Sequence, residues 1–240
     1  FGIYERFLGV EANKKDYITS GQIFHQIYLN ERAGKYLGQT VSVEHVIDEI
    51  KTRMIDFANQ CEVGIVELGA TIGDIKGVFF LEAVRQLIND LEDTQSIFVL
   101  LSHFPYLSNV QEVKTMGCQR SVTALMSKGI KPEIIIARTS DITELRDYQL
   151  SKIEKFCEVS KKAVFCVPNL ADEYQLPQYL ENIGLHQRIA QKLNLSLESD
   201  GLARWYQSLP SKNDLKIALV GKYPHVDAYV SIKQQLKLLG

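Results

Sequence analysis

Two carboxylates separated by a glycine-containing turn are the first residues of this sequence that could do chemistry. Glu67 follows the apolar run Val63–Val66, and Asp74 comes seven positions after Glu67, with two glycines between them. The apolar run predicts a buried strand, and the carboxyl end of a strand in an open parallel sheet is where ligands bind. A helix is expected to begin at about Phe79, so its amino terminus would face the same edge. This arrangement suits a nucleotide with bound Mg²⁺.

A second polar segment lies between residues 112 and 122. Lys114 and Gln119 flank a turn of small residues that leads into a predicted helix. An ammonium group donates hydrogen bonds to phosphate oxygens, and an amide both donates and accepts. The segment therefore predicts a cradle for a phosphate or a polar base.

Bulk composition excludes several classes of partner. The chain has 240 residues, with 27 Lys and Arg against 29 Asp and Glu, for a net charge of -2. No basic field favours a nucleic acid or an anionic membrane, so neither partner is expected. No apolar run approaches the roughly 20 residues of a membrane span, and no signal peptide is visible. We therefore expect a cytoplasmic protein.

The four cysteines are scattered through the chain without a CxxC pair. Cys61, Cys157 and Cys166 stand at the edges of apolar runs, which predicts buried thiols in a reducing compartment. None of the four has the glycine-flanked strand-to-helix turn of a nucleophilic cysteine.

Alternating apolar runs and helical patterns predict an α/β fold, with a mainly parallel sheet and helices on both of its faces. The expected strands are nearly continuous β-branched runs: Val63–Leu68, Ser96–Ser102, Glu133–Arg138 and Ala163–Val167. The expected helices have apolar residues at three-and-four spacing: Val43–Phe57, Phe79–Leu91, Gln119–Lys128 and Asp147–Cys157. Glu173–Leu193 is expected to be helical after a break at Pro177.

A domain boundary is predicted near Leu209. The polar stretch 210–214 precedes a new apolar run, Leu215–Val220, a Gly-Lys-Tyr turn and a helix from about Ala228. A linker followed by strand, turn and helix is typical of the start of a second α/β domain. We therefore expect one domain over 1–209, a linker at 210–214 and an incomplete domain at 215–240.

Together these segments resemble the CTP synthase family, the glutamine-dependent amidoligases that convert UTP to CTP. Any one matching piece is weak, but the pieces follow the family's order. They are Tyr4–Phe7 (GxYERF), Glu31–Gly38 (ERxGxYLG), Glu67–Ile75 (EIGGTVGDIE), Phe80–Gln86 (FLEAIRQ), Glu112–Thr115 (GEVKT) and Gly221–Tyr229 (GKYxxxxDAY).

The resemblance implies a P-loop, dethiobiotin-synthetase-like synthetase domain whose first strand and phosphate loop would precede Phe1. Residues 215–240 would begin a class I glutaminase domain. The implied reaction uses ATP to phosphorylate the uracil O4, and ammonia from glutamine then displaces the phosphate. The resemblance also implies Mg²⁺ as cofactor, ATP as co-substrate, UTP and CTP as ligands, and a homotetramer. Without the phosphate loop, residues 1–240 are expected to be inactive alone.

The resemblance assigns roles to individual residues, though no catalytic side chain within this chain. Glu67 matches the family's magnesium-binding glutamate and, with Arg138 and Leu170, would line the ATP site. His103 is expected to be structural. The residues that would bind UTP or CTP are Asp74, Ile75, Lys76, Lys114, Thr115, Met116, Gly117, Cys118, Gln119 and Lys152.

Two departures from the family pattern bear on regulation. Lys76 stands where the family has a glutamate that accepts hydrogen bonds from ribose hydroxyls, whereas an ammonium group only donates. Met116, Gly117 and Cys118 replace Lys, Pro and Thr, which removes a cation, a rigid φ and a hydroxyl. The change at Lys76 predicts weak feedback inhibition by CTP, and the changes at 116–118 favour a solvated turn before the helix over a phosphate-binding loop.

Two other interpretations stay open at this point. One is a degenerate, non-catalytic paralogue that assembles with or regulates a true CTP synthase, which Lys76 and the altered loop favour. The other is a different amidoligase of the same superfamily, such as a dethiobiotin or cobyrinate-type synthetase. The glutaminase-like segment 221–229 argues against that second alternative.

Overall fold

The computed structural model describes residues 2–92, 95–142, 144–197, 200–209, 216–223, 225 and 228–239. The chain divides into two compact units, one of residues Ile18–Leu197 and one that combines Phe1–Tyr17 with Glu198–Gly240. The linker expected at 210–214 lies outside the described residues.

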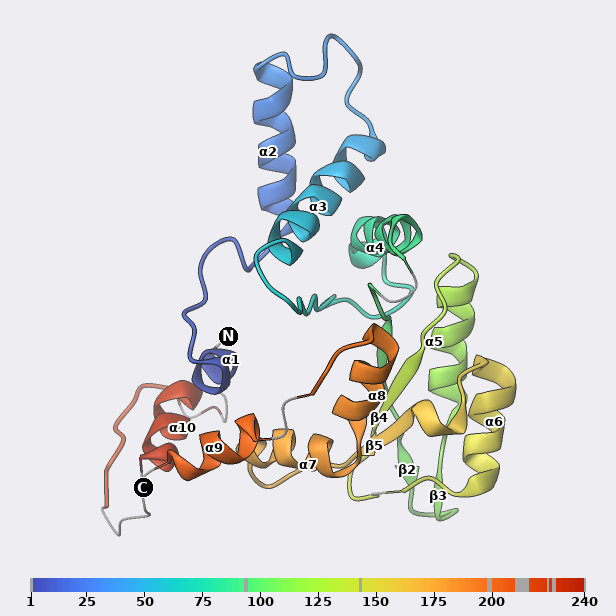
Figure 1. Cartoon of the computed structure of the whole chain (residues 1–240), viewed down its shortest axis with the longest axis vertical. Helices are drawn as coiled ribbons and strands as arrows, with labels where there is room; N and C mark the ends of the chain where they lie inside the picture. Colours follow the sequence, from blue (N-terminus) through green and yellow to red (C-terminus); the bar gives the residue numbers. More distant parts are fainter. Residues whose placement is uncertain are drawn as a thin grey trace. The chain divides into compact units, whose positions relative to one another are not determined.

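A three-stranded parallel sheet lies in the larger unit (Figure 1). Its strands are β1 (Val99–His103), β4 (Ile134–Arg138) and β5 (Val164–Val167), in the order β1-β4-β5. Each parallel pair requires a crossover connection, and helices α5 (Met116–Met126) and α6 (Asp147–Cys157) supply it. The predicted parallel α/β fold and three of its four expected strands are therefore confirmed.

The main core lies between the sheet and the crossover helices. Val122 and Leu125 of α5 and Ile153 of α6 have no exposed surface and belong to one apolar cluster with Ile135 of β4. Figure 1 shows α5 and α6 on one side of the sheet and α7 (Leu176–Asn182) and α8 (Leu185–Leu193) on the other. Helices thus cover both faces, as the strand and helix alternation predicts.

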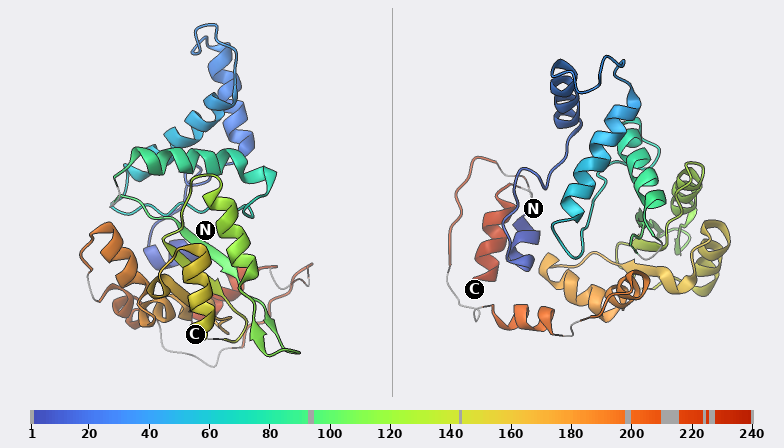
Figure 2. Two further views of the ribbon diagram at one scale, coloured as in Figure 1. Left: turned by 90° about the vertical axis from the view of Figure 1, so that its right-hand side faces the viewer. Right: turned by 45° about the horizontal axis from the view of Figure 1, so that its top comes forward.

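Three further helices form a second core above the first. Helices α2 (Ser20–Arg32), α3 (Val43–Ala58) and α4 (Val78–Asp90) pack against one another, and Figure 2 shows this group in two further orientations. Their shared cluster includes Ile23 and Ile50, each about 1% exposed. Helix α4 joins the two cores, because Leu81 belongs to the first cluster and Ala83 to the second.

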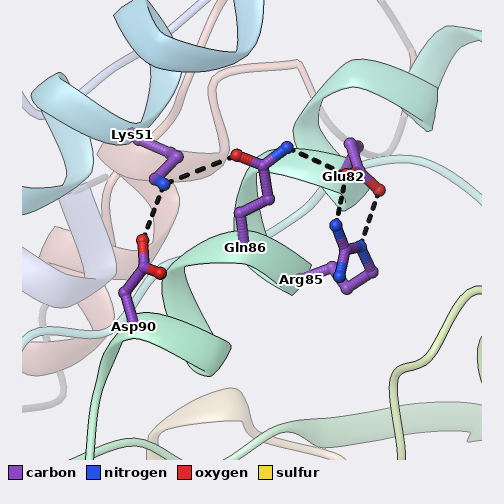
Figure 3. Close-up of polar contacts among 5 residues, drawn as sticks. All are labelled: Lys51, Glu82, Arg85, Gln86 and Asp90. Atoms are coloured by element: carbon purple, nitrogen blue, oxygen red, sulfur yellow. Dashed lines mark hydrogen bonds and ion pairs between the residues drawn. The ribbon is translucent and has the colours of Figure 1, made fainter. Parts of the chain in front are cut away.

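A polar network fixes α3 against α4 on the rim of this second core (Figure 3). Lys51 of α3 pairs with Asp90 at 2.7 Å and donates to Gln86 at 3.4 Å. Gln86 in turn donates to Glu82 at 2.9 Å, and Arg85 forms two hydrogen bonds with the same carboxylate. These bonds lower the pKa of Glu82 to about 2, chiefly through Arg85 and then Gln86.

One expected strand is wrong. Residues 63–68 form no ladder with any described strand, and the side chains of Val63, Ile65 and Val66 are 48%, 85% and 46% exposed. A strand is stabilised by a neighbour that satisfies its backbone groups, and the described sheet does not extend beyond β1 on this side. Cys61, which precedes this segment and was expected to be buried, is also exposed. Cys157 is buried and Cys166 is half-buried.

Several boundaries also differ from expectation. The predicted helix Gln119–Lys128 begins earlier, at Met116. Pro177 does not break the helical stretch after the short turn η3 (Glu173–Gln175), because it sits in the first turn of α7, where its missing N–H has no partner to lose. The break comes instead at Gly184, whose φ of +77° places it in the left-handed region. A short hairpin of β2 (Tyr106–Leu107) and β3 (Glu112–Val113) was not expected.

The smaller unit contains α1 (Gly2–Leu8), α9 (Gly201–Gln207) and α10 (Val230–Leu238). The Nε1 of Trp205 donates to the carbonyl oxygen of Arg6 at 2.9 Å, and its ring lies 4.2 Å from that of Phe7. The strand expected at 215–220 is not formed by its described residues 216–220, since the described part of this unit offers helices but no strand for it to pair with. Within the described residues, no helix is long and apolar enough to cross a membrane.

Candidate functional site

The three strands end at one edge of the sheet. His103 of β1 pairs with Arg138 of β4, and Arg138 pairs with Val167 of β5, so the carboxyl ends are level. The guanidinium of Arg138 donates to the carbonyl oxygen of Pro168 at 3.3 Å and to the side-chain oxygen of Asn169 at 3.0 Å. It is therefore held against the loop that continues into Leu170. Arg138 and Leu170, two of the three residues assigned to the ATP site, thus lie on adjacent segments at the carboxyl edge of the sheet, where ligands bind in open parallel sheets.

Residues 114–119, called the loop 114–119 below, run from the β2–β3 hairpin through the first turn of α5. Hydrogen bonds hold this segment in place. The backbone N–H of Lys114 donates to the carbonyl oxygen of Pro105 at 2.9 Å. The side chain of Gln119 donates to the hydroxyl of Thr115 at 2.9 Å, and Thr115 is only 7% exposed. A Cβ at Gly117 would stand 4.0 Å from the carbonyl oxygen of His103, so the first turn of α5 lies beside the end of β1.

One nucleotide-binding candidate, Lys114, contacts the carboxylate of Glu112, and a second, Lys152, lies beside another partner of that carboxylate. Glu112 forms an ion pair with Lys114 through one oxygen and accepts a hydrogen bond from the hydroxyl of Tyr148 through the other, at 3.3 Å. The ammonium group of Lys152 lies 5.4 Å from the centre of the Tyr148 ring. The pKa of Glu112 is lowered first by the hydrogen bond from Lys114 and further by Tyr148 and the charge of Lys152. Burial opposes this shift.

This cluster has a surplus of positive charge. Glu112 is the partner of Lys114 and of the Tyr148 hydroxyl, and the ammonium group of Lys152 lies beside the Tyr148 ring. A phosphate could therefore replace Glu112 as the partner of Lys114 and Tyr148 without loss of charge pairing. Glu112 and Tyr148 are not among the residues predicted from the sequence. The only sequence signal for Tyr148 is its spacing of four from Lys152, which places both on one face of α6.

A buried amide ties the two halves of the cluster together. Gln149 of α6 is 3% exposed and donates to the carbonyl oxygen of Val113 at 2.8 Å. Val113 belongs to β3 and directly precedes Lys114, whereas Gln149 lies next to Tyr148. This hydrogen bond therefore fixes the hairpin side of the cluster against its helix side.

An open groove runs beside the loop on the outer face of α5. Its volume is about 400 Å³, and Phe156 of α6 forms one wall. Met116 and Gln119 of the loop also line it, with Arg120, Thr123, Ala124 and Ser127. Met116 and Phe156 are 55% and 54% exposed, so the groove combines apolar and polar surface suited to a planar polar ring.

The segment 69–77 is a tight turn set by two glycines. Gly73 has φ +94°, in the left-handed region, and a Cβ at Gly77 would stand 2.8 Å from the Cβ of Ala70. Asp74 caps the short helix η1 (Ile75–Gly77) by accepting from the backbone N–H of Lys76 at 3.0 Å. The side chains of Ile75 and Lys76 are exposed. The turn thus displays the Asp-Ile-Lys triplet to solvent.

Glu67 is exposed, between Val66 and the half-buried Leu68, which packs on both cores. It therefore does not stand at the end of a sheet strand, as was expected. Among the described residues, no cluster of three or more His, Cys, Asp or Glu could hold a metal. Mg²⁺ commonly takes one or two carboxylates together with phosphate oxygens and water. Glu67 therefore fits a Mg²⁺ that arrives with a nucleotide rather than one held by protein ligands alone.

The predicted site residues form two groups in the structure. In the first group, Lys114 contacts Glu112, Lys152 lies beside Tyr148, and Thr115–Gln119 follow Lys114 into the first turn of α5. In the second group, Arg138 and Leu170 lie at the sheet edge. No described hydrogen bond or ion pair joins Glu67 or the 74–76 triplet to either group.

Comparison with known proteins identifies the relatives of this chain. Residues 1–195 match the family described as the CTP synthase N-terminus. Over 98% of its length the chain is 39% identical to the CTP synthase of Sulfurisphaera tokodaii and 40% identical to that of Lawsonia intracellularis. It covers 45% and 44% of those proteins, so it spans somewhat less than half the length of these relatives.

Proposed function

Because the chain belongs to the CTP synthase family, we propose that it forms the pyrimidine-nucleotide and ATP sites of an enzyme that aminates UTP to CTP. The observation that supports this function most is that Lys114 and Lys152, distant in sequence, lie near each other. Lys114 pairs with Glu112, Glu112 accepts a hydrogen bond from Tyr148, and the Tyr148 ring lies 5.4 Å from the ammonium group of Lys152. Both lysines match positions that bind the pyrimidine nucleotide in the resemblance.

A different amidoligase is excluded by the family assignment. The degenerate paralogue is favoured only by Lys76 and the altered residues 116–118, and neither the described contacts nor the comparisons add support for it.

In the proposed complex, each group of residues has a separate task. Lys114, Lys152 and the hydroxyl of Tyr148 bind the phosphates of UTP, which displace Glu112 from Lys114. Gln119 and the groove beside it hold the uracil ring. Arg138 and Leu170 bind ATP, and Glu67 binds the accompanying Mg²⁺, which neutralises charge during phosphoryl transfer.

The chemistry follows from the weakness of a carbonyl oxygen as a leaving group. ATP with Mg²⁺ supplies a phosphoryl group for the uracil O4, which ammonia then displaces. In the proposal, ammonia comes from glutamine through a glutaminase domain that begins at residues 215–240, after a linker at 210–214. We also propose that the protein is a homotetramer and is located in the cytoplasm. The support for the glutaminase start is the Gly221–Tyr223 match and the helix α10; Asp227 of the same match lies outside the described residues.

Binding of UTP to the chain tests this function without requiring turnover. Replacing both lysines, Lys114→Ala with Lys152→Ala, removes two charge-assisted contacts worth about 1.5–3 kcal/mol each. We expect at least about a hundredfold rise in the dissociation constant for UTP, measured by isothermal titration calorimetry.

Lys131→Ala is the control, because the ammonium group of Lys131 pairs with the exposed Glu158 at 2.8 Å and Lys131 lines neither the cluster around Glu112 nor the groove. Its UTP affinity should equal that of the unmodified chain. An unchanged affinity in the double variant would refute the proposed site.

A further inference from the structure

The carboxylate of Glu112 makes the contacts that the proposed site offers to a phosphate. One of its oxygens pairs with Lys114, and the other accepts a hydrogen bond from the hydroxyl of Tyr148 at 3.3 Å. The hydrogen bond from Lys114 lowers the pKa of Glu112, so the carboxylate is ionised at neutral pH. An anion that belongs to the protein therefore lies where the anion of a ligand would bind.

The backbone fixes this pairing. Side chains alternate between the two faces of an extended chain, so Glu112 and Lys114 share a face, and Val113 between them is buried, at 6% exposure. The backbone N–H of Lys114 donates to the carbonyl oxygen of Pro105 at 2.9 Å, and the carbonyl oxygen of Val113 accepts from Gln149 at 2.8 Å. The ion pair is therefore set by the hairpin and by its contact with α6.

Lys152 adds a further positive charge to this site. Its ammonium group lies 5.4 Å from the centre of the Tyr148 ring, and none of the carboxylates among the described residues forms an ion pair with it. A small anion that replaces Glu112 only exchanges one partner of Lys114 for another. A ligand with several charged groups also gains Lys152 as a partner, so its binding is favourable overall.

We propose that Glu112 is an internal competitor of anionic ligands: its carboxylate occupies Lys114 and Tyr148 and must leave them before a phosphate binds. Binding is then an exchange, in which one ion pair and one hydrogen bond within the protein are replaced by equivalent contacts with the ligand. The exchange lowers the affinity for every anion at Lys114 by the same factor, so that only a ligand with additional contacts, such as a polyphosphate that reaches Lys152, binds tightly. That this ligand is UTP rests on the proposed function, whereas the competition itself does not.

The displaced carboxylate can turn into water. The side chain of Glu112 is already 28% exposed in the paired state, and it stands on the two-residue strand β3 of a hairpin whose other strand, β2, is exposed. Rotation about its side-chain bonds carries the carboxylate into solvent, so the exchange leaves no buried charge without a partner. The competition is therefore reversible and requires no movement of the backbone.

Titration with inorganic tripolyphosphate tests the competition without a base or a sugar. Isothermal titration calorimetry compares the unmodified chain of residues 1–240 with Glu112→Gln, which keeps the size of the side chain and removes its charge. We expect the dissociation constant to fall about tenfold, close to the lower value for a charge-assisted hydrogen bond that no longer has to be broken. Glu112→Ala should give a gain of similar size, which makes the result independent of contacts made by the new amide.

Asp147→Asn is the matched control. Asp147 directly precedes Tyr148 and pairs with Lys161 at 2.6 Å, so this change also removes one negative charge from an ion pair on α6. It frees no candidate ligand group, and the affinity for tripolyphosphate should change less than about twofold. Circular dichroism establishes that the variants are folded. An equal gain in Asp147→Asn, which would indicate general charge repulsion, or an unchanged or undetectable affinity in both Glu112 variants would overturn the proposal.

UTP titration of the same samples distinguishes this inference from the proposed function. Tighter binding of tripolyphosphate in the Glu112 variants, with no binding of UTP, would support the competition and count against the proposed function alone. UTP binding that depends on Lys114 and Lys152 but does not strengthen in the Glu112 variants would count against the competition alone.

Discussion

The two segments assigned to the pyrimidine nucleotide are held in different ways. The loop 114–119 rests on a buried threonine, a buried cysteine and a hairpin that Gln149 joins to α6. The 74–76 triplet is held mainly by local turn geometry and one capping hydrogen bond, and its side chains are exposed. The loop is therefore placed by tertiary packing, and the triplet by its own short sequence. Substitutions around the loop should therefore change the free energy of buried packing, whereas substitutions in the triplet should change only local hydrogen bonding.

The largest expected difference is in stability. Ile153 of α6 is 0% exposed beneath the loop, whereas Ile75 of the triplet is 83% exposed. Ile153→Ala should lower the free energy of unfolding by about 2–5 kcal/mol, because it removes buried methyl groups and leaves a cavity. Ile75→Ala should change it by less than about 0.5 kcal/mol. Urea denaturation of both variants measures the contrast, and equal losses would contradict the distinction between the segments.

The next difference concerns the hydrogen bonds that hold each segment. Gln149→Leu removes the donor to the buried carbonyl of Val113 and should cost about 1–3 kcal/mol of unfolding free energy. Asp74→Ala removes an exposed cap and should cost about 0.5–1 kcal/mol, the low end for a helix cap. Thermal melts report both costs. A larger cost at Asp74 would show that the turn is held more firmly than its exposure indicates.

A smaller effect is expected in ligand selectivity. Lys76 is exposed and presents a donor where the family has an acceptor for ribose hydroxyls. Lys76→Glu should tighten CTP binding by about tenfold, close to the lower value for a charge-assisted hydrogen bond, without a matching change for UTP. Parallel titrations with CTP and UTP measure the two affinities. Equal changes for both nucleotides would mean that this position does not distinguish them.

The smallest effect lies away from both segments, at the Glu82 network that holds α4. The folded-state pKa of Glu82 is about 2, below the ordinary value of 4.5, so its stabilisation is present at neutral pH. That contribution is lost as the pH falls from 4.5 toward 2. The carboxylate is partly exposed, so Glu82→Gln should cost no more than about 1 kcal/mol at neutral pH.

Measuring the free energy of unfolding at a series of acidic pH values tests whether this stabilisation is lost as the pH falls. The unmodified protein should lose more stability than Glu82→Gln between pH 4.5 and 2. Identical acid profiles would show that the network does not contribute measurably.

Local sequence pattern by itself determined much of this molecule. Helix Asp147–Cys157 has the predicted bounds, α3 differs from prediction by one residue at its carboxyl end, and α4 differs by one residue at each end. Strands β1, β4 and β5 lie within or overlap their predicted runs. Periodicity is a property of neighbouring residues, so it can be read without knowing the fold. The ordered family motifs likewise identified the family before any contact was known.

Tertiary structure alone decided which distant residues meet. The run Val63–Leu68 has the composition of a buried strand, yet without a paired neighbour it is exposed, and Cys61 with it. Glu112 gains its role from Lys114 and Tyr148, and Gln149 finds a buried partner in the carbonyl oxygen of Val113. The type of a residue indicates whether its side chain is stable when buried and whether it can form an ion pair. Its partner depends on how helices and strands pack, and that packing is specified jointly by residues far apart in the chain.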